Sequence, residues 1–166
     1  MKTYDFSICV SNTKTDKEKW YNSDDFYSYD DMYNTIVDDI GNGEEIRITS
    51  AKGVPNELIK DYPTPLNAEL LESMYDYIEA SEYDQIYIRE FWAEIDNNET
   101  VSHIRDMFGG ETDAFYHNTA VEILANKYNV NYDNVDELLQ FVNVEELVDY
   151  RYRFEITKTS NFVFWF

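Results

Sequence analysis

The excess of carboxylates is the feature that most constrains how this chain can fold. Acidic side chains outnumber basic ones by 34 to 13, which gives the 166 residues a formal net charge of −21. Such a charge keeps a protein in solution but adds self-repulsion to its compact state. Aromatic residues make up 17% of the chain, whereas disordered acidic segments are poor in them. The composition therefore indicates a folded protein that buries a core and keeps its carboxylates on the surface.

The negative charge is concentrated in the middle of the chain. Residues 1–20 hold 3 acidic and 4 basic side chains, whereas residues 21–100 hold 20 acidic and only 4 basic ones. Residues 101–166 hold 11 acidic and 5 basic side chains. We therefore expect the strongest negative field over residues 21–100.

The remaining composition predicts a cytoplasmic protein of a bacterial host cell. Cys9 is the single cysteine, so no disulfide can form within the chain. The first residues lack the apolar run of a signal peptide, and no stretch approaches the ~18 apolar residues of a membrane span. The abundance of Asn, Asp, Tyr, Ile and Lys is typical of an AT-rich genome, such as that of a low-GC bacterium, its phage or a mobile element.

The first third of the chain predicts two strands and a helix. Apolar residues at every second position of 4–10 have the period of a half-buried strand, and the polar stretch 11–19 predicts a loop. Ser28 stands three residues before Asp31, which is the pattern of a helix cap. Apolar spacing continues this helix to Gly41, a plausible stop, and alternation at 45–49 predicts a second strand.

The rest of the chain predicts mostly helices. Asn67 caps a helix whose apolar face comprises Leu70, Leu71, Met74, Tyr77 and Ile78. Residues 84–95 are ambiguous between strand and helix, and a helix over 99–108 is expected to end at Gly109-Gly110. Further helices are expected over 112–127, 135–142 and 145–150. Residues 151–157 and 161–166 predict a β-hairpin around Lys158-Thr159-Ser160. Together these elements predict the α+β class.

The chain shows no set of residues that would make it an enzyme or give it a cofactor. His103 and His117 are 14 residues apart, which is outside the spacing of local metal motifs, and Cys9 falls in strand alternation, where a small packing residue is expected. Asp133 and Asp136 lack the glycine of a calcium-binding loop. The acidic pairs at 38–39 and 44–45 flank a turn, where a solvated loop is favoured over a weak cation site. A non-enzymatic protein without cofactor or metal is therefore expected.

One helix carries its carboxylates in a regular row. Glu69, Glu72, Asp76 and Glu79 share the face opposite the apolar one, and they repeat every ~4.5–6 Å along the axis. That spacing is comparable with the distance between phosphates along a nucleic-acid strand. No Lys or Arg follows Glu69, Glu72 or Glu79 at i+4, whereas an ordinary solvated helix mixes charges of both signs.

The acidic surface predicts a basic partner. At one charge per ~1.7 Å of duplex, 21 net charges match roughly 36 Å of DNA. A DNA-binding protein with a Lys- and Arg-lined channel would be attracted to such a surface. The alternative is that acidity serves solubility alone. The candidate phosphate-mimicking residues are Asp24, Asp25, Asp30, Asp31, Asp38, Asp39, Glu44, Glu45, Glu69, Glu72, Asp76, Glu79, Glu82, Asp84, Glu90, Glu94, Asp96 and Glu99.

Three stretches resemble the ArdA antirestriction proteins of conjugative elements and phages. Tyr33–Gly41, followed by Glu44-Glu45, a short strand and Pro55, is similar to the family's order of helix, glycine, Glu-Glu strand and proline. The acidic helix over 67–80 and the segment Val148–Arg153 before the final strands have counterparts there too. The resemblance implies an elongated architecture of three small subdomains, here 1–63, 64–110 and 111–166, and a homodimer.

The function that the resemblance implies is inhibition of a bacterial defence nuclease by imitation of DNA. The target is expected to be a type I restriction–modification enzyme, or a CRISPR effector with a basic nucleic-acid channel. The chain itself is expected to bind neither nucleic acid nor membrane. An immunity protein or antitoxin that blocks a basic nuclease toxin is the alternative, because it would use the same electrostatics on one cognate partner.

Overall fold

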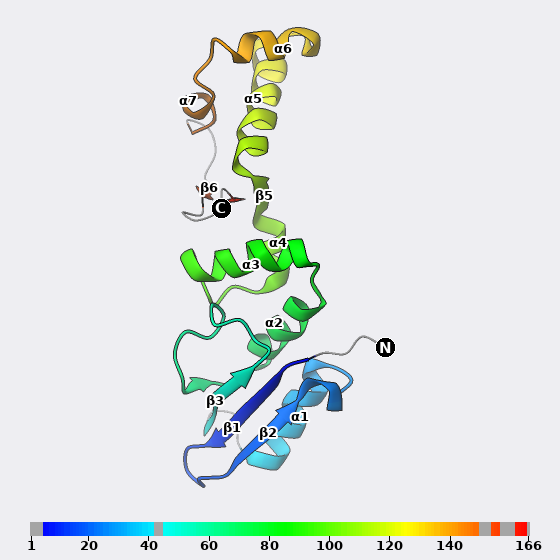
Figure 1. Cartoon of the computed structure of the whole chain (residues 1–166), viewed down its shortest axis with the longest axis vertical. Helices are drawn as coiled ribbons and strands as arrows, with labels where there is room; N and C mark the ends of the chain where they lie inside the picture. Colours follow the sequence, from blue (N-terminus) through cyan, green and yellow to red (C-terminus); the bar gives the residue numbers. More distant parts are fainter. Residues whose placement is uncertain (1–4, 42–44, 150–153, 157–161, 166) are drawn as a thin grey trace. The chain divides into compact units, whose positions relative to one another are not determined.

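The computed structural model describes residues 5–41, 45–149, 154–156 and 162–165. The chain divides into two compact units, residues 1–105 (unit 1) and residues 106–166 (unit 2). Both units combine helices with antiparallel strands, which confirms the α+β class (Figure 1). Three subdomains were expected, but the boundary at residue 63 falls inside unit 1. Residues on both sides of it belong to one sheet, because Thr64-Pro65 pairs with Arg47-Ile48.

Unit 1 is built on a four-stranded antiparallel sheet in the order β2-β1-β3-β4. The strands span Ser7–Asn12 (β1), Glu18–Asn22 (β2), Ile46–Lys52 (β3) and Thr64–Pro65 (β4). Side chains of the two central strands make up much of its core, and Ile8, Val10, Ile46 and Ile48 are all 0% exposed. The loop expected over 11–19 contains the start of β2. Hydrophobic alternation does not reveal this strand, because it lies at a sheet edge where four of its five residues are exposed.

Local caps position the helices of unit 1. A 3₁₀ turn, η1 (Ser23–Asp25), leads into the first helix. The helices are α1 (Tyr29–Ile40), α2 (Ala68–Glu79), α3 (Glu82–Glu94) and α4 (Val101–Met107). The predicted caps are confirmed, since Ser28 Oγ accepts from the Asp31 amide at 3.2 Å and Asn67 Oδ1 accepts from the Leu70 amide at 2.7 Å. Gly41 ends α1 with φ +123°. The ambiguous segment 84–95 is helical, because α3 begins at a further cap, Ser81.

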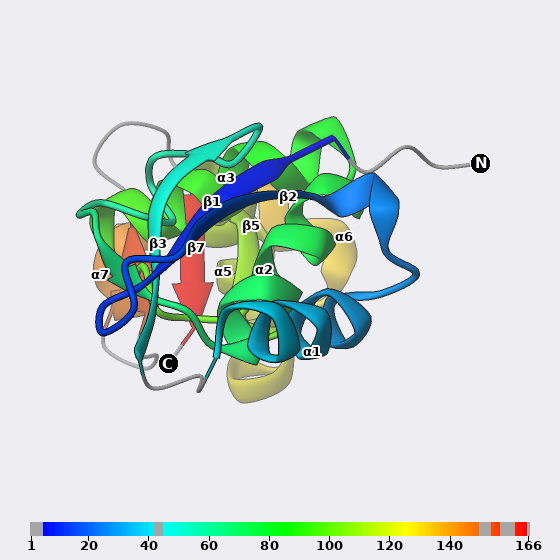
Figure 2. The same ribbon diagram turned by 90° about the horizontal axis from the view of Figure 1, so that it is seen from below.

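The core of unit 1 joins the sheet to α2 and α3. Figure 2 shows α1 and α2 on the same side of the sheet, and α1 packs against both β1 and α2. Phe6 meets Tyr75 edge to face at 5.1 Å between ring centroids, and the Tyr75 hydroxyl donates to the Ser23 carbonyl at 3.1 Å. Tyr77 packs on Trp92 of α3 with centroids 5.6 Å apart. Helix α2 is therefore held on several sides at once.

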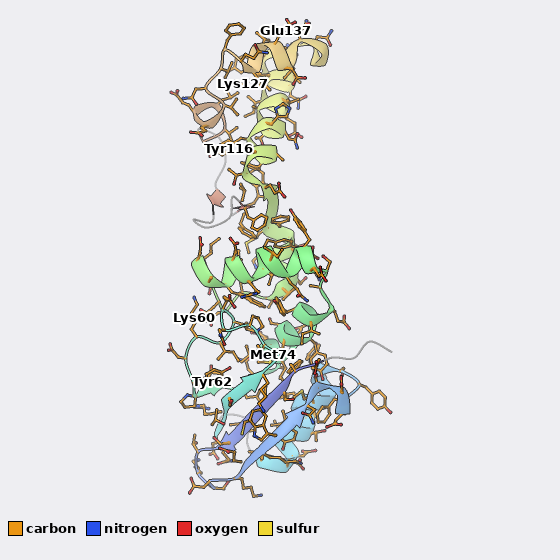
Figure 3. The ribbon with its side chains drawn as sticks, viewed as in Figure 1. Lys60, Tyr62, Met74, Tyr116, Lys127 and Glu137 are labelled. Atoms are coloured by element: carbon orange, nitrogen blue, oxygen red, sulfur yellow. The ribbon has the colours of Figure 1, made fainter. Side chains whose placement is uncertain are left out.

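Unit 2 is a small α+β unit with its own core. It contains β5 (Phe108–Glu111), α5 (Thr112–Tyr128), α6 (Tyr132–Leu139), α7 (Val144–Asp149), β6 (Phe154–Ile156) and β7 (Phe162–Trp165). The buried side chains Phe115, Ala120, Ile123, Val148 and Val163 form the core. In Figure 3, Tyr116 and Lys127 mark two levels of α5, and Glu137 lies on α6. Tyr116 packs against that core, whereas Lys127 is exposed.

The sheet of unit 2 corrects one prediction and confirms another. Strands β6 and β7 pair antiparallel as the predicted hairpin, while its turn, Lys158-Thr159-Ser160, lies outside the described residues. Gly109 and Gly110 do not terminate a helix, because α4 ends at Met107 and both glycines lie in β5. A Cβ on Gly109 would come within 2.9 Å of Trp165 Nε1. The glycine thus permits close strand packing, which local sequence patterns do not report. None of the described helices could cross a membrane.

Candidate partner-binding surface

The four carboxylates of α2 lie together on the outer side of unit 1, and we call them the α2 ridge: Glu69, Glu72, Asp76 and Glu79. At about 100° per residue they fall within about 80° of the helix circumference. Most of the remaining circumference is covered, because Leu71, Ser73, Met74, Tyr75 and Tyr77 are all buried. Ser73 and Tyr75 lie beyond the apolar face that the sequence predicted. The acids thus lie on the side of the helix that the core leaves open, where Glu69 and Glu79 are exposed and Glu72 and Asp76 are partly buried.

The other candidate acids are distributed over several elements of unit 1. Asp24 and Asp25 lie exposed in η1, and α1 carries Asp30 and Asp31 in its first turn and Asp38 and Asp39 in its last. Glu82, Asp84, Glu90 and Glu94 belong to α3, and Asp96, Glu99 and Glu45 lie in or beside loops. Glu44 lies outside the described residues. Acids in a first helical turn also stabilise the helix itself, by interacting with its positive end.

Several candidates form ion pairs within unit 1. Lys19 Nζ lies 2.6 Å from Asp39 Oδ2, and Lys14 contacts Glu45. Arg105 lies 3.2 Å from Asp84, and His103 Nδ1 lies 2.8 Å from Glu99 Oε1. The hydrogen bonds from Lys19 and from Tyr21 hold the pKa of Asp39 below its ordinary value. These four carboxylates therefore have roles inside the fold.

The ridge concentrates like charge. Burial, followed by the neighbouring Glu72 carboxylate, raises the pKa of Asp76 above its ordinary value, and Glu79 acts in the same direction. The negative charge of Asp30, and after it that of Glu72, raises the pKa of the Tyr29 phenol. Because Glu72 belongs to the ridge, the start of α1 lies beside the ridge. Like charge therefore acts together with burial to raise the pKa of Asp76.

Two residues of this surface could not be found from the sequence. Tyr29 comes from α1, which precedes the ridge in the chain, and Arg105 comes from α4, which follows it, so neither is a sequence neighbour of the ridge. The Arg105 charge favours ionisation of Asp76 while its guanidinium pairs with Asp84. The search for Lys or Arg at i+4 could not detect Arg105, because i+4 spacing identifies neighbours within one helix only. One arginine therefore offsets part of the ridge at Asp76.

The burial of Asp76 and the acidic side chains beside it predict that Asp76→Asn stabilises the protein at neutral pH. The substitution removes like-charge pairs at i−4 and i+3, each costing about 0.2–0.5 kcal/mol. Because the folded pKa is raised above 3.8, protonation of Asp76 favours the fold, and this contribution is lost as the pH rises through the folded pKa. The advantage of the variant should be absent below about pH 3.8 and reach its full size above the folded pKa.

Thermal unfolding from about pH 2 to pH 7 measures this effect. Asp39→Asn is the matched control, because it also removes one carboxylate but from a site whose pKa is lowered by Lys19. That variant should lose stability at neutral pH, and the loss should disappear as the pH falls through the folded pKa of Asp39. Equal shifts for both variants would show that net charge alone, and not the ridge, sets the effect.

The cysteine and the two histidines lie in surroundings typical of structural residues. Burial raises the pKa of the Cys9 thiol, and this side chain is 3% exposed, as expected for a packing residue. His103 and His117 are exposed and lie beside single carboxylates, Glu99 and Asp136. Within the part of the chain that the structure describes, no group of three or more His, Cys, Asp or Glu side chains is placed to hold a metal ion.

Comparison with known proteins adds no relative. No protein-family model, curated protein or solved structure matches this chain. The resemblance to the ArdA family therefore stays a prediction, and the surface itself is the basis for any functional assignment.

Proposed function

We propose that this chain is a DNA-mimic inhibitor of a bacterial defence nuclease, a type I restriction–modification enzyme or a CRISPR effector. The α2 ridge is the observation that carries the proposal. Its four carboxylates lie in a single strip along a helix whose other sides are largely buried, and their spacing along the axis is comparable with that of phosphates. A basic channel that accommodates a phosphate row would meet a similar row of charge.

The electrostatics of the ridge favour a partner over a purely solubilising role. Scattered, fully solvated acids would serve solubility equally well and would avoid the burial and the like-charge repulsion that raise the pKa of Asp76. A cationic partner would remove that repulsion on binding, so part of the charge conflict in the free protein becomes affinity for the target. The exposed acids of η1 and α1 would extend the same negative surface.

Competition with DNA tests the proposal. A purified type I restriction–modification enzyme, bound to a fluorescent duplex that carries its recognition site, is titrated with the protein at 50 to 200 mM salt. We expect displacement of the duplex, with an apparent affinity that falls steeply as salt rises, because both ligands use the same basic groups. The same assay with a CRISPR effector identifies the other expected target class.

The controls separate the proposal from its alternative. Titration of the labelled duplex alone should give no binding, since two negatively charged molecules repel. Failure to displace DNA from either enzyme class, or displacement that does not depend on salt, would overturn the proposal. Selective capture of a basic nuclease toxin, with no effect on the defence enzymes, would instead establish an immunity protein.

A further inference from the structure

A pocket lies beside the first turn of α2 in unit 1. Its volume is about 410 Å³, within the range of ligand-binding pockets. Three parts of the chain form the wall: the segment 58–65 between β3 and α2, the start of α2, and the loop 97–99 after α3. Lys60, labelled in Figure 3, lies on the first of these. All three parts belong to unit 1, so the pocket is a feature of that unit alone.

Hydrogen bonds hold the walls of the pocket in place. Asn97 Nδ2 donates to the Leu58 carbonyl at 3.3 Å, which connects the loop after α3 to the segment before α2. Trp92 Nε1 donates to the Glu99 carbonyl at 2.9 Å, and the Trp92 side chain is fully buried. These contacts within unit 1 fix the walls of the pocket, so binding would cost little ordering.

The lining combines negative charge with apolar surface. Asp61 and Glu69 contribute two carboxylates against the single Lys60, and asparagine and serine side chains add further polar groups. Leu58, Ile59 and Leu70 line the same pocket. An anion would meet net repulsion there. A planar cation on an aliphatic stem would meet acceptors for its donors and apolar contact for its stem, and arginine has both parts.

We propose that this pocket receives an arginine side chain of the protein that the acidic surface binds. The inference rests on the proposed function for its partner and adds the recognition of one residue. Glu69 belongs both to the α2 ridge and to the pocket lining, so the two features are continuous. The ridge supplies attraction over a distance, whereas the pocket supplies geometry, because a guanidinium presents its five donors in a fixed plane.

The first test uses no partner protein. The full chain, labelled with ¹⁵N, is titrated with N-acetyl-arginine-methylamide and, in parallel, with the corresponding lysine derivative. We expect the arginine derivative to shift the signals of Asn97, Asn98 and Ser73 more than those of the exposed acids of η1. Asp61→Asn/Glu69→Gln should weaken this binding by about tenfold or more, the value of one charge-assisted hydrogen bond.

Asp24→Asn/Asp25→Asn is the matched control, because it removes two carboxylates of unit 1 that do not line the pocket. It should bind the arginine derivative nearly as the unchanged protein does. Three results would each overturn the assignment of the pocket to arginine. They are equal binding of the arginine and lysine derivatives, signal shifts spread over the whole acidic surface, and equal losses of binding in both double variants.

The DNA-competition assay distinguishes the two proposals. If the unchanged protein displaces DNA and Asp61→Asn, which removes a pocket carboxylate outside the ridge, does so equally well, the pocket takes no arginine of the target, and the proposed function stands. If the unchanged protein does not displace DNA, the proposed function fails, and with it the assignment of the arginine to that target. Far-ultraviolet circular dichroism of both double variants should match that of the unchanged protein, since all four positions are at the surface.

Discussion

The variant Glu69→Gln/Glu72→Gln/Asp76→Asn/Glu79→Gln is expected to lose most of its ability to displace DNA from the target enzyme. Each removed carboxylate contributes about 0.5–1 kcal/mol at a partly solvated interface, so the four together correspond to a loss of about 30- to 800-fold. The dependence of log affinity on log salt should also become shallower, by up to about four units. Single substitutions should change affinity only a few-fold, because the binding energy is spread over the row.

A variant with the same net charge provides the control. Glu122→Gln/Asp136→Asn/Glu137→Gln/Glu145→Gln removes four exposed carboxylates from unit 2 and leaves unit 1 unchanged. If the ridge binds the target, this variant should compete nearly as well as the unchanged protein. Equal losses in both quadruple variants would mean that the target senses total charge, and the ridge would no longer be the site.

Trp92→Ala should be the most destabilising of the substitutions considered. The Trp92 side chain is 0% exposed, packs on Tyr77 of α2 and donates to the Glu99 carbonyl. Truncation of a buried tryptophan to alanine costs about 3–5 kcal/mol, and small domains are stable by only about 5–15 kcal/mol. We therefore expect unit 1 to unfold at much lower urea concentration, with loss of both the ridge geometry and the arginine pocket.

Urea unfolding followed by circular dichroism measures this loss, with Trp20→Ala as the control. Trp20 lies on the edge strand β2 and is 43% exposed, so its removal should cost less than about 1 kcal/mol. Trp92→Phe should fall between the two, since it keeps most of the buried ring but loses the hydrogen bond to Glu99. Similar midpoints for Trp92→Ala and Trp20→Ala would contradict the assignment of Trp92 to the core.

Features that depend on neighbouring residues were predictable. Ser28 and Asn67 cap their helices as expected, because a cap is a contact between residues three apart. The row of carboxylates on α2 was also visible, since helical periodicity alone places Glu69 to Glu79 on one face. Segment 84–95 is ambiguous in the sequence because the hydrophobic pattern of α3 is weak, whereas the structure shows the cap at Ser81 that begins this helix.

The sequence by itself determined that this is an α+β protein whose acids are concentrated on the helices and loops of its middle. Only the tertiary structure decided which acids act together. Pairing of β2 with β1, approach of Tyr29 to Glu72, and placement of Arg105 near Asp76 all join residues far apart in the chain. Local sequence patterns do not predict such contacts, because the contacts depend on how the elements pack. The same packing leaves the α2 ridge open to solvent and forms the walls of the pocket beside it.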